Sequence, residues 1–234
     1  MALNQWLRAA ADVLMPRTCS VCGTTLGADE PYVCRGCMAH LPRTRLEQVE
    51  FNTMEQLFAG KVPIERAAGF FYYEKDSPYA SIIHDAKYRN MPKLGQWIAG
   101  QAYAEMKGSG FFEGIEVVVP VPLHRDKLAS RGYNQTLYIA RGIARAAGIA
   151  VAEAVKAARS HSTQTRKGAL ERWQNTRGMY CLKAGASTAL EGKRVLVVDD
   201  VVTTGSTLEA CAEALLAVPG VKISLFTLAV ARLS

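Results

Sequence analysis

The residues best suited to chemistry lie in one segment near the C-terminus, between Val195 and Leu208. Four apolar residues lead into two acids, Asp199 and Asp200, and a turn of small, hydroxylated residues then precedes a helical pattern. Backbone amides at the start of a helix, with Thr and Ser hydroxyls beside them, form a cradle for anions. Two carboxylates at the carboxyl end of a buried strand can accept hydrogen bonds from paired sugar hydroxyls or help to order Mg²⁺. The segment therefore predicts a sugar-phosphate site; the structural alternative is an acidic pair that only caps the helix.

Four of the six cysteines form two Cys-x-x-Cys pairs, Cys19 with Cys22 and Cys34 with Cys37. Each short turn presents two thiolates, and the loop between the pairs lets them converge on a tetrahedral Zn²⁺ ion. The alternatives are two disulfides or a redox dithiol, but we recognise no export signal, and a reducing cytoplasm keeps thiols free for metal. A catalytic zinc site usually includes His, Asp or Glu ligands and keeps one coordination position open, and no such residue lies at ligand spacing here. Four cysteines would fill all four positions, so a structural zinc site is predicted.

Positive charge gathers in the middle of the chain. Residues 120–180 hold eleven basic and three acidic side chains, in a protein whose formal net charge is +7. A charge run is often only a solvated surface, yet this concentration of Arg favours a ligand that carries phosphate. The charge of the whole chain is too modest to establish nucleic-acid binding by itself.

Hydrophobic periodicity predicts the elements that must hold these residues in place. Strand-like runs cover residues 67–73, 116–119, 152–156, 179–182, 194–198 and 222–228, and helical patterns cover 78–88, 93–107, 134–147 and 206–217. The unbroken apolar run over 195–198 is typical of a strand buried on both faces of a mostly parallel sheet covered by helices. We expect an N-terminal helix and zinc-binding module over residues 1–42, a linker over 43–62 and an α/β domain over 63–234.

Two features bear on the location of the protein in the cell. No run approaches the ~18 apolar residues that a membrane span requires. Residues 1–14 carry an apolar stripe interrupted by Arg8 and Asp12, which favours a short helix packed on the protein over an export signal or a helix that binds a membrane or partner. We therefore expect a cytoplasmic protein with no membrane span.

The segment from Val195 to Thr207 resembles the signature with which type I phosphoribosyltransferases bind 5-phosphoribosyl 1-pyrophosphate (PRPP). The resemblance implies a type I phosphoribosyltransferase fold and a ligand that is PRPP or another phosphorylated ribose, bound with Mg²⁺. It also implies that Asp199 and Asp200 hold the 2′- and 3′-hydroxyls of the ribose, and that the residues from Thr203 onward hold the 5′-phosphate. The rest of the implied PRPP-binding set is Val201, Thr203, Thr204, Gly205, Ser206 and Thr207.

Motifs elsewhere are similar to the ComF family, the DNA-uptake competence proteins of this superfamily. They are the four cysteines, Ile83-His84-x-x-Lys87-Tyr88, Val119-Pro120-Val121-Pro122-Leu123-His124-Arg125, Arg131-Gly132-Tyr133-Asn134-Gln135, and the spaced Gln164, Arg172 and Asn175. This resemblance covers nearly the whole chain and implies a zinc module, a hood segment and a phosphoribosyltransferase core. Lys87 would be a hood residue that faces the site, or else a solvent-exposed residue of its helix.

Two further segments would handle the pyrophosphate in this family. The turn after Val119 resembles the pyrophosphate loop, and residues 159–177 resemble the flexible lid that closes over it, although the latter is also compatible with an ordinary surface loop. The pyrophosphate-binding and lid candidates are Arg125, Arg131, Asn134, Arg166 and Arg172. The predicted catalytic residues, which would act by positioning and charge stabilisation, are Asp199, Asp200 and Arg131.

Two functions are compatible with these features, and both connect the chain with DNA uptake in natural competence through the ComF resemblance. In the first, an enzyme transfers the ribose 5-phosphate of PRPP to a nitrogen acceptor and releases pyrophosphate. In the second, the same anion site belongs to a non-catalytic module that binds single-stranded DNA or a DNA-uptake protein, with PRPP as ligand or regulator.

Overall fold

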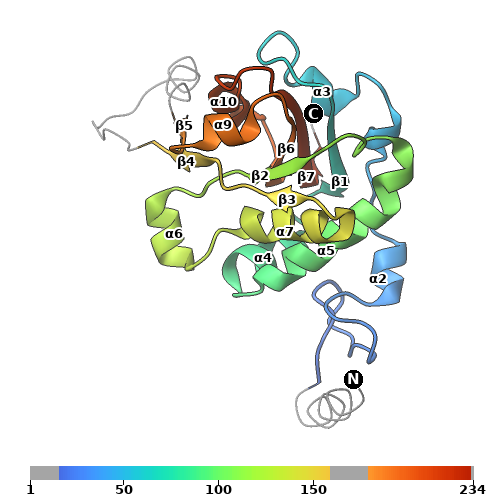
Figure 1. The fold of residues 1–234 in the computed structure, drawn as a ribbon. Helices are drawn as coiled ribbons and strands as arrows, with labels where there is room; N and C mark the ends of the chain where they lie inside the picture. The colour runs from blue at the N-terminus through green and yellow to red at the C-terminus, as the bar shows by residue number, and fades with distance from the viewer. Residues whose placement is uncertain (1–15, 159–178, 233–234) are drawn as a thin grey trace, which may run out of the picture.

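Five parallel strands form the central sheet of the computed structural model, which describes residues 16–158 and 179–232 (Figure 1). The strands are, in sheet order, β1 (Ala67–Tyr73), β7 (Lys222–Ala231), β6 (Arg194–Val202), β2 (Val117–Pro120) and β3 (Ala150–Val151). Every neighbouring pair in this sheet runs parallel. The predicted α/β class with a mostly parallel sheet is therefore confirmed.

Helices cover both faces of the sheet. The helices α4 (Ala80–Tyr88), α5 (Pro92–Met106) and α7 (Gln135–Ala147) lie on one face, and α9 (Ala186–Leu190) and α10 (Ser206–Leu215) lie on the other (Figure 1). Residues 195–198 of β6 are completely buried because these two layers exclude water from both faces of the strand. The remaining short helices are α2 (Arg35–Ala39), α3 (Thr53–Gln56), α6 (Arg125–Arg131), η1 (Leu46–Gln48) and η2 (Lys107–Ser109).

The strand expected over residues 152–156 is split in the structure. Residues 150–151 join the edge of the main sheet as β3, whereas β4 (Val155–Ala157) pairs with β5 (Tyr180–Leu182) in a separate antiparallel sheet. Local periodicity does not distinguish one interrupted strand from two, because the change of sheet depends on which partner strand lies alongside.

Residues 43–62, expected to be a linker, pack against β1. The short helix α3 begins at Asn52, whose side chain and Glu55 form a capping box. Met54 and Phe58 are completely buried, and Arg43 forms a β-bridge with Phe71 of β1. The segment showed no clear periodicity because helices of three or four residues are too short to display one.

The sheet register places the two acids where a ligand can reach them. Pro120 of β2 pairs with Val198 of β6, and the amide of Val121 donates to the carbonyl of Val198 at 3.0 Å. The loop that follows β2 therefore lies beside Asp199 and Asp200 at the carboxyl edge of the sheet. This edge is where open α/β sheets bind their ligands.

The described helices also bear on the expectation about membranes. In residues 16–158 and 179–232, no helix combines the length and the hydrophobicity needed to cross a bilayer. The helix predicted over residues 1–14 lies outside the described residues.

Candidate functional site

Asp200 lies in a network that joins three separate parts of the chain. Its carboxylate forms an ion pair with Lys87 of α4, with 2.8 Å between Nζ and Oδ1. The side-chain amide of Gln135, at the start of α7, donates to Oδ2 of Asp200 at 2.7 Å. Arg131 in turn donates to the carbonyl oxygen of the Gln135 side chain. Asp200, whose side chain is only 9% exposed, is thus compensated by a cation and an amide, and the predicted hood residue Lys87 faces the site.

Asp199 is in a different electrostatic position. Burial, followed by the nearby charge of Asp200, raises the pKa of Asp199 to about 8. The backbone amide of Asp200 donates to Oδ1 of Asp199 at 2.8 Å, and Lys87 and Lys127 also oppose the rise in pKa. At neutral pH Asp199 is therefore largely neutral.

The turn after β6 has the conformation expected of an anion cradle. Gly205 precedes α10 with φ 81°, a left-handed conformation that side chains rarely adopt. A methyl group on Gly205 would approach the ring of Phe58 to 3.0 Å, so the residue is restricted by space as well as by conformation. No side chain caps this helix. Its first backbone amides are therefore free of a side-chain acceptor, and the Thr204 and Ser206 hydroxyls contact each other at 3.0 Å beside them.

An open cleft of about 780 Å³ lies over the acids, and we call it the carboxylate cleft. One wall carries Asp199, Asp200, Val201, Thr203 and Thr207, and the other carries residues of α4, α6 and the start of α7. The volume is in the range of small-molecule sites. The cleft brings an acidic pair, hydroxyl groups and several cations onto one solvent-accessible surface.

The predicted pyrophosphate residues occupy different places. Arg131 lines the carboxylate cleft, and its guanidinium lies 5.0 Å from the centre of the Tyr88 ring. Asn134 is not among the lining residues of the described chain; it caps α7 and donates to the carbonyl of Val121 at 3.1 Å. Arg125 is exposed at the first position of α6 and is also absent from the described lining. Arg166 and Arg172 of the predicted lid lie outside the described residues.

Several lining residues were not predicted from the sequence as site residues, among them Gln135, Tyr88 and Lys127. In the sequence, Gln135 is only the last residue of the motif that begins at Arg131, Tyr88 is a neighbour of Lys87, and Lys127 is one of the basic residues of segment 120–180. Tyr88 is 66% exposed, which is unusual for a large aromatic side chain. The sequence did contain a signal for Tyr88, because it follows His84 by four residues and this spacing places both side chains on one face of a helix. In the structure the two rings lie 5.2 Å apart.

A second site lies in the N-terminal region, where the sulfur atoms of Cys19, Cys22, Cys34 and Cys37 all lie within 4.8 Å of one another. The Cys22 and Cys34 sulfurs are 3.8 Å apart, too far for the ~2.05 Å of a disulfide bond. Hydrogen bonding between Cys22 and Thr24 lowers the pKa of Cys22 to about 6, which favours a thiolate at neutral pH.

The geometry of the four thiols suits zinc. Zinc–sulfur bonds of about 2.3 Å in a tetrahedron correspond to sulfur–sulfur edges of about 3.8 Å. The backbone amides of Val21 and Cys34 point at the Cys19 sulfur at 3.4 and 3.3 Å, which orients that ligand. The four-cysteine cluster can therefore hold a metal ion such as zinc, and with four thiolates the coordination shell would be closed.

Comparisons with known proteins bear on the carboxylate cleft. A family model described as a phosphoribosyl transferase domain matches residues 134–232, which include the acids and the turn of the carboxylate cleft. Competence protein F of Haemophilus influenzae is 30% identical over 135 residues, covering 56% of this chain and 58% of that protein. The DNA utilization protein YhgH of Escherichia coli is 27% identical over 143 residues, covering 59% of this chain and 61% of that protein.

These relatives, the matched domain and the four-cysteine cluster together fit a ComF-family protein. The resemblance noted in the sequence is confirmed, because a phosphoribosyltransferase-type domain and a four-cysteine cluster occur together in a chain with these relatives. The alignments span about three fifths of each curated relative, at 58% and 61% of their lengths.

The solved structures that this chain resembles are only remotely similar to it. Adenine phosphoribosyltransferase of Thermoanaerobacter pseudethanolicus is 15% identical, with a TM-score of 0.37 and coverage of 76% of this chain and 99% of that chain. The allosteric regulatory enzyme of purine biosynthesis is 21% identical, with a TM-score of 0.36 and coverage of 61% and 26%.

Proposed function

We propose that this ComF-family chain binds PRPP with Mg²⁺ in the carboxylate cleft and acts as a phosphoribosyltransferase. The observation that carries the proposal is the position of Asp199 and Asp200 at the carboxyl end of β6, directly before the Gly205 turn and inside an open cleft. A sugar phosphate needs both parts at this spacing, with hydroxyl acceptors on one side and phosphate donors on the other. An acidic pair that only capped α10 would not need the cations opposite it.

The cleft residues suggest roles in the reaction. Asp199 and Asp200 accept hydrogen bonds from the ribose hydroxyls, and the first amides of α10 hold the 5′-phosphate. Carboxylate oxygens also suit Mg²⁺, which would neutralise part of the charge on PRPP when bound. Lys87 Nζ lies 2.8 Å from Oδ1 of Asp200, so the ribose hydroxyls would share or replace this contact.

The chemistry is a substitution at the anomeric carbon of the ribose. The bond from this carbon to the pyrophosphate oxygen breaks and its electron pair leaves with the pyrophosphate. A nitrogen of the acceptor supplies the electron pair of the new bond and then loses its proton. Arg131, on the cleft wall, is placed to stabilise charge on the departing pyrophosphate, a role that requires positioning rather than a nucleophile.

We also propose a role in DNA uptake in a reducing compartment such as the cytoplasm, where the thiols stay available for metal. The support is the similarity to a protein named for competence and to proteins named for DNA utilization. The second candidate function is a non-catalytic module in which the same anion site binds single-stranded DNA, or regulates its handling, with PRPP as effector.

The deciding experiment incubates the zinc-loaded protein with PRPP, Mg²⁺ and a panel of purine and pyrimidine bases while pyrophosphate is measured. Pyrophosphate release that depends on one base would support the enzyme. Calorimetric binding of PRPP without release would support the module, and the absence of PRPP binding would contradict both forms of the proposal.

The pKa of Asp199 leads to a prediction about pH. An ionised carboxylate accepts stronger hydrogen bonds from ribose hydroxyls than a neutral one does, and Asp199 ionises at about pH 8. The PRPP affinity of the wild type should therefore rise relative to that of Asp199→Asn as pH increases from about 6 to 9, by about fivefold, and should level off above that range. The ratio removes the titration of PRPP itself, which both proteins share. A ratio that is constant with pH would show that Asp199 does not contact the ligand in its ionised form.

A further inference from the structure

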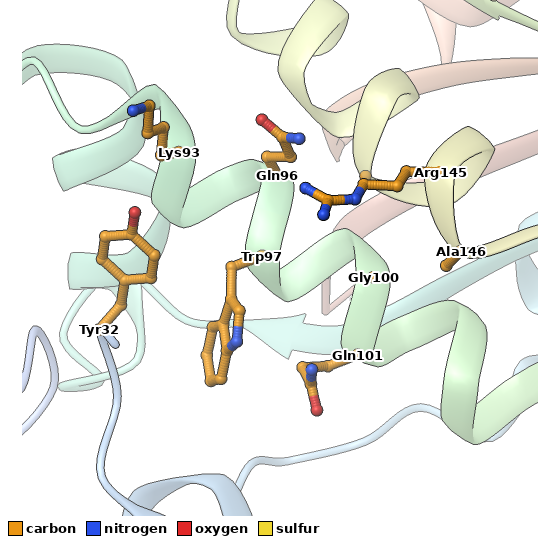
Figure 2. Close-up of a pocket in the computed structure, with 9 residues that line it drawn as sticks. Tyr32, Lys93, Gln96, Trp97, Gly100, Gln101, Arg145 and Ala146 are labelled. Atoms are coloured by element: carbon orange, nitrogen blue, oxygen red, sulfur yellow. The ribbon is translucent and has the colours of Figure 1, made fainter. Parts of the chain in front are cut away.

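A second cavity, of about 590 Å³, lies on the outer side of α5, away from the carboxylate cleft. Its walls come from α5, from the last turn of α7 and from the loop between the two cysteine pairs, which contributes Tyr32 (Figure 2). We call it the aromatic pocket. It shares no lining residue with the carboxylate cleft in the part of the chain that the structure describes.

The aromatic side chains of this pocket offer a flat apolar surface. Tyr32 and Trp97 lie with ring centres 6.0 Å apart and planes tilted by 55°, and both are half-buried. Figure 2 shows them projecting from α5 and from the cysteine loop on the same side of the pocket. At this distance the Tyr32 and Trp97 rings leave no room for a ligand ring between them. A flat ligand would therefore stack on the free face of Trp97.

The polar side chains of the pocket are positively charged or neutral. Lys93 and Arg145 are the cations, and Gln96 and Gln101 are the amides; the described lining includes no acidic residue. Figure 2 shows Arg145 reaching from α7 over Gly100 towards Gln96. Within residues 16–158 and 179–232, none of these four side chains forms a hydrogen bond or ion pair with the protein. Their donors and acceptors are therefore available to a ligand.

This lack of partners distinguishes the aromatic pocket from the cavity next to it. There Arg43 forms a double hydrogen bond with Glu105 at 2.6 and 2.7 Å, and it also donates to the carbonyl of Met38 at 2.7 Å. A surface whose charges are already paired stabilises the fold. Lys93 and Arg145 form no such ion pair within the described residues.

The floor of the pocket is kept open by small residues at the crossing of α5 and α7. A methyl group on Gly142 would lie 2.1 Å from the carbonyl oxygen of Gln96, so glycine is required for the two helices to approach this closely. Gly100 and Ala146 complete the floor. The close crossing holds Trp97 and Arg145, which stand on different helices, at fixed positions across the pocket.

We propose that the aromatic pocket binds a nucleotide unit, with its base stacked on Trp97 and its phosphate on Arg145 and Lys93. The two amides can hydrogen-bond the edge of a base, and stacking tolerates any base because each has a π-face. The same chemistry is present in a free mononucleotide and in a single strand of DNA. This site does not depend on PRPP binding in the other cleft.

The test measures binding of a fluorescein-labelled oligothymidylate and of adenosine monophosphate to the full zinc-loaded chain. Trp97→Leu should weaken binding about tenfold through lost stacking.

Arg145→Glu changes an exposed side chain and should leave the fold intact. It should weaken binding and lower the slope of log affinity against log salt by at least about one. The matched control is Lys107→Glu, which makes the same charge change at an exposed residue outside the pocket and should have little effect.

The two probes distinguish the source of the nucleotide. Binding of the monophosphate with the same sensitivity to Arg145→Glu would identify a mononucleotide site, and binding of the oligonucleotide alone would identify a strand site; both support the proposal. Absence of binding by either probe would overturn it. Oligonucleotide binding that Arg145→Glu and Lys107→Glu weaken equally would also overturn it, because the effect would then be one of general charge.

Discussion

Asp200→Asn should reduce the affinity for PRPP by about 10- to 100-fold, since a hydrogen bond to a charged group contributes about 1.5–3 kcal/mol and the substitution removes the charge from the Asp200 contact with the ribose. The substitution also leaves the ammonium group of Lys87, now 2.8 Å from the carboxylate, facing a neutral amide. Isothermal titration calorimetry with PRPP and Mg²⁺ measures the effect directly.

The control for this prediction is Asp76→Asn, which makes the same chemical change at an exposed residue after β1. It should bind PRPP like the wild type. The zinc content and the circular dichroism of Asp200→Asn should match those of the wild type, because the cysteine cluster is a separate part of the chain. An unchanged PRPP affinity in a folded Asp200→Asn protein would rule out the carboxylate cleft as the PRPP site.

Cys34→Ser should remove the metal from the N-terminal cluster and unfold the surrounding loops. Structural zinc sites supply about 10–16 kcal/mol of folding free energy in isolated zinc-finger peptides, and a hydroxyl does not replace a thiolate ligand. The serine can still cap α2, because Cys34 is the residue whose side chain accepts from the amide of Cys37. Any loss of order is then attributable to the metal. Metal content per chain and limited proteolysis near residues 16–42 measure the two effects.

Cys181→Ser is the matched control, because Cys181 is a half-buried thiol in β5, far along the chain from the cluster. It should retain one metal ion per chain. The central sheet should remain folded in Cys34→Ser, since its core is formed by β1, β2, β6 and β7 with their helices. Full metal occupancy in Cys34→Ser would show that the four thiols do not form the metal site.

Much of the fold was predictable because its signals are local. The run over 67–73 coincides with β1, and the helical patterns over 134–147 and 206–217 agree with α7 and α10 within two residues. Such patterns depend on residues a few positions apart. Because β6 is apolar on both of its faces, it must be covered on both sides of the sheet. The packing of Phe58 beneath Gly205 was not predictable, because it joins a short helical segment to a turn far away in the chain.

The acids, the Gly205 turn and the double Cys-x-x-Cys pattern were determined by the sequence alone, because in each case the ligand-binding groups lie within a few residues of one another and local backbone geometry orients them. Only the tertiary structure decided which groups face those acids. Lys87 and Gln135 reach Asp200 from two helices on the same side of the sheet, and Trp97 and Arg145 line one pocket from two different helices. Pairs of this kind depend on strand order and helix packing, which no short stretch of sequence encodes.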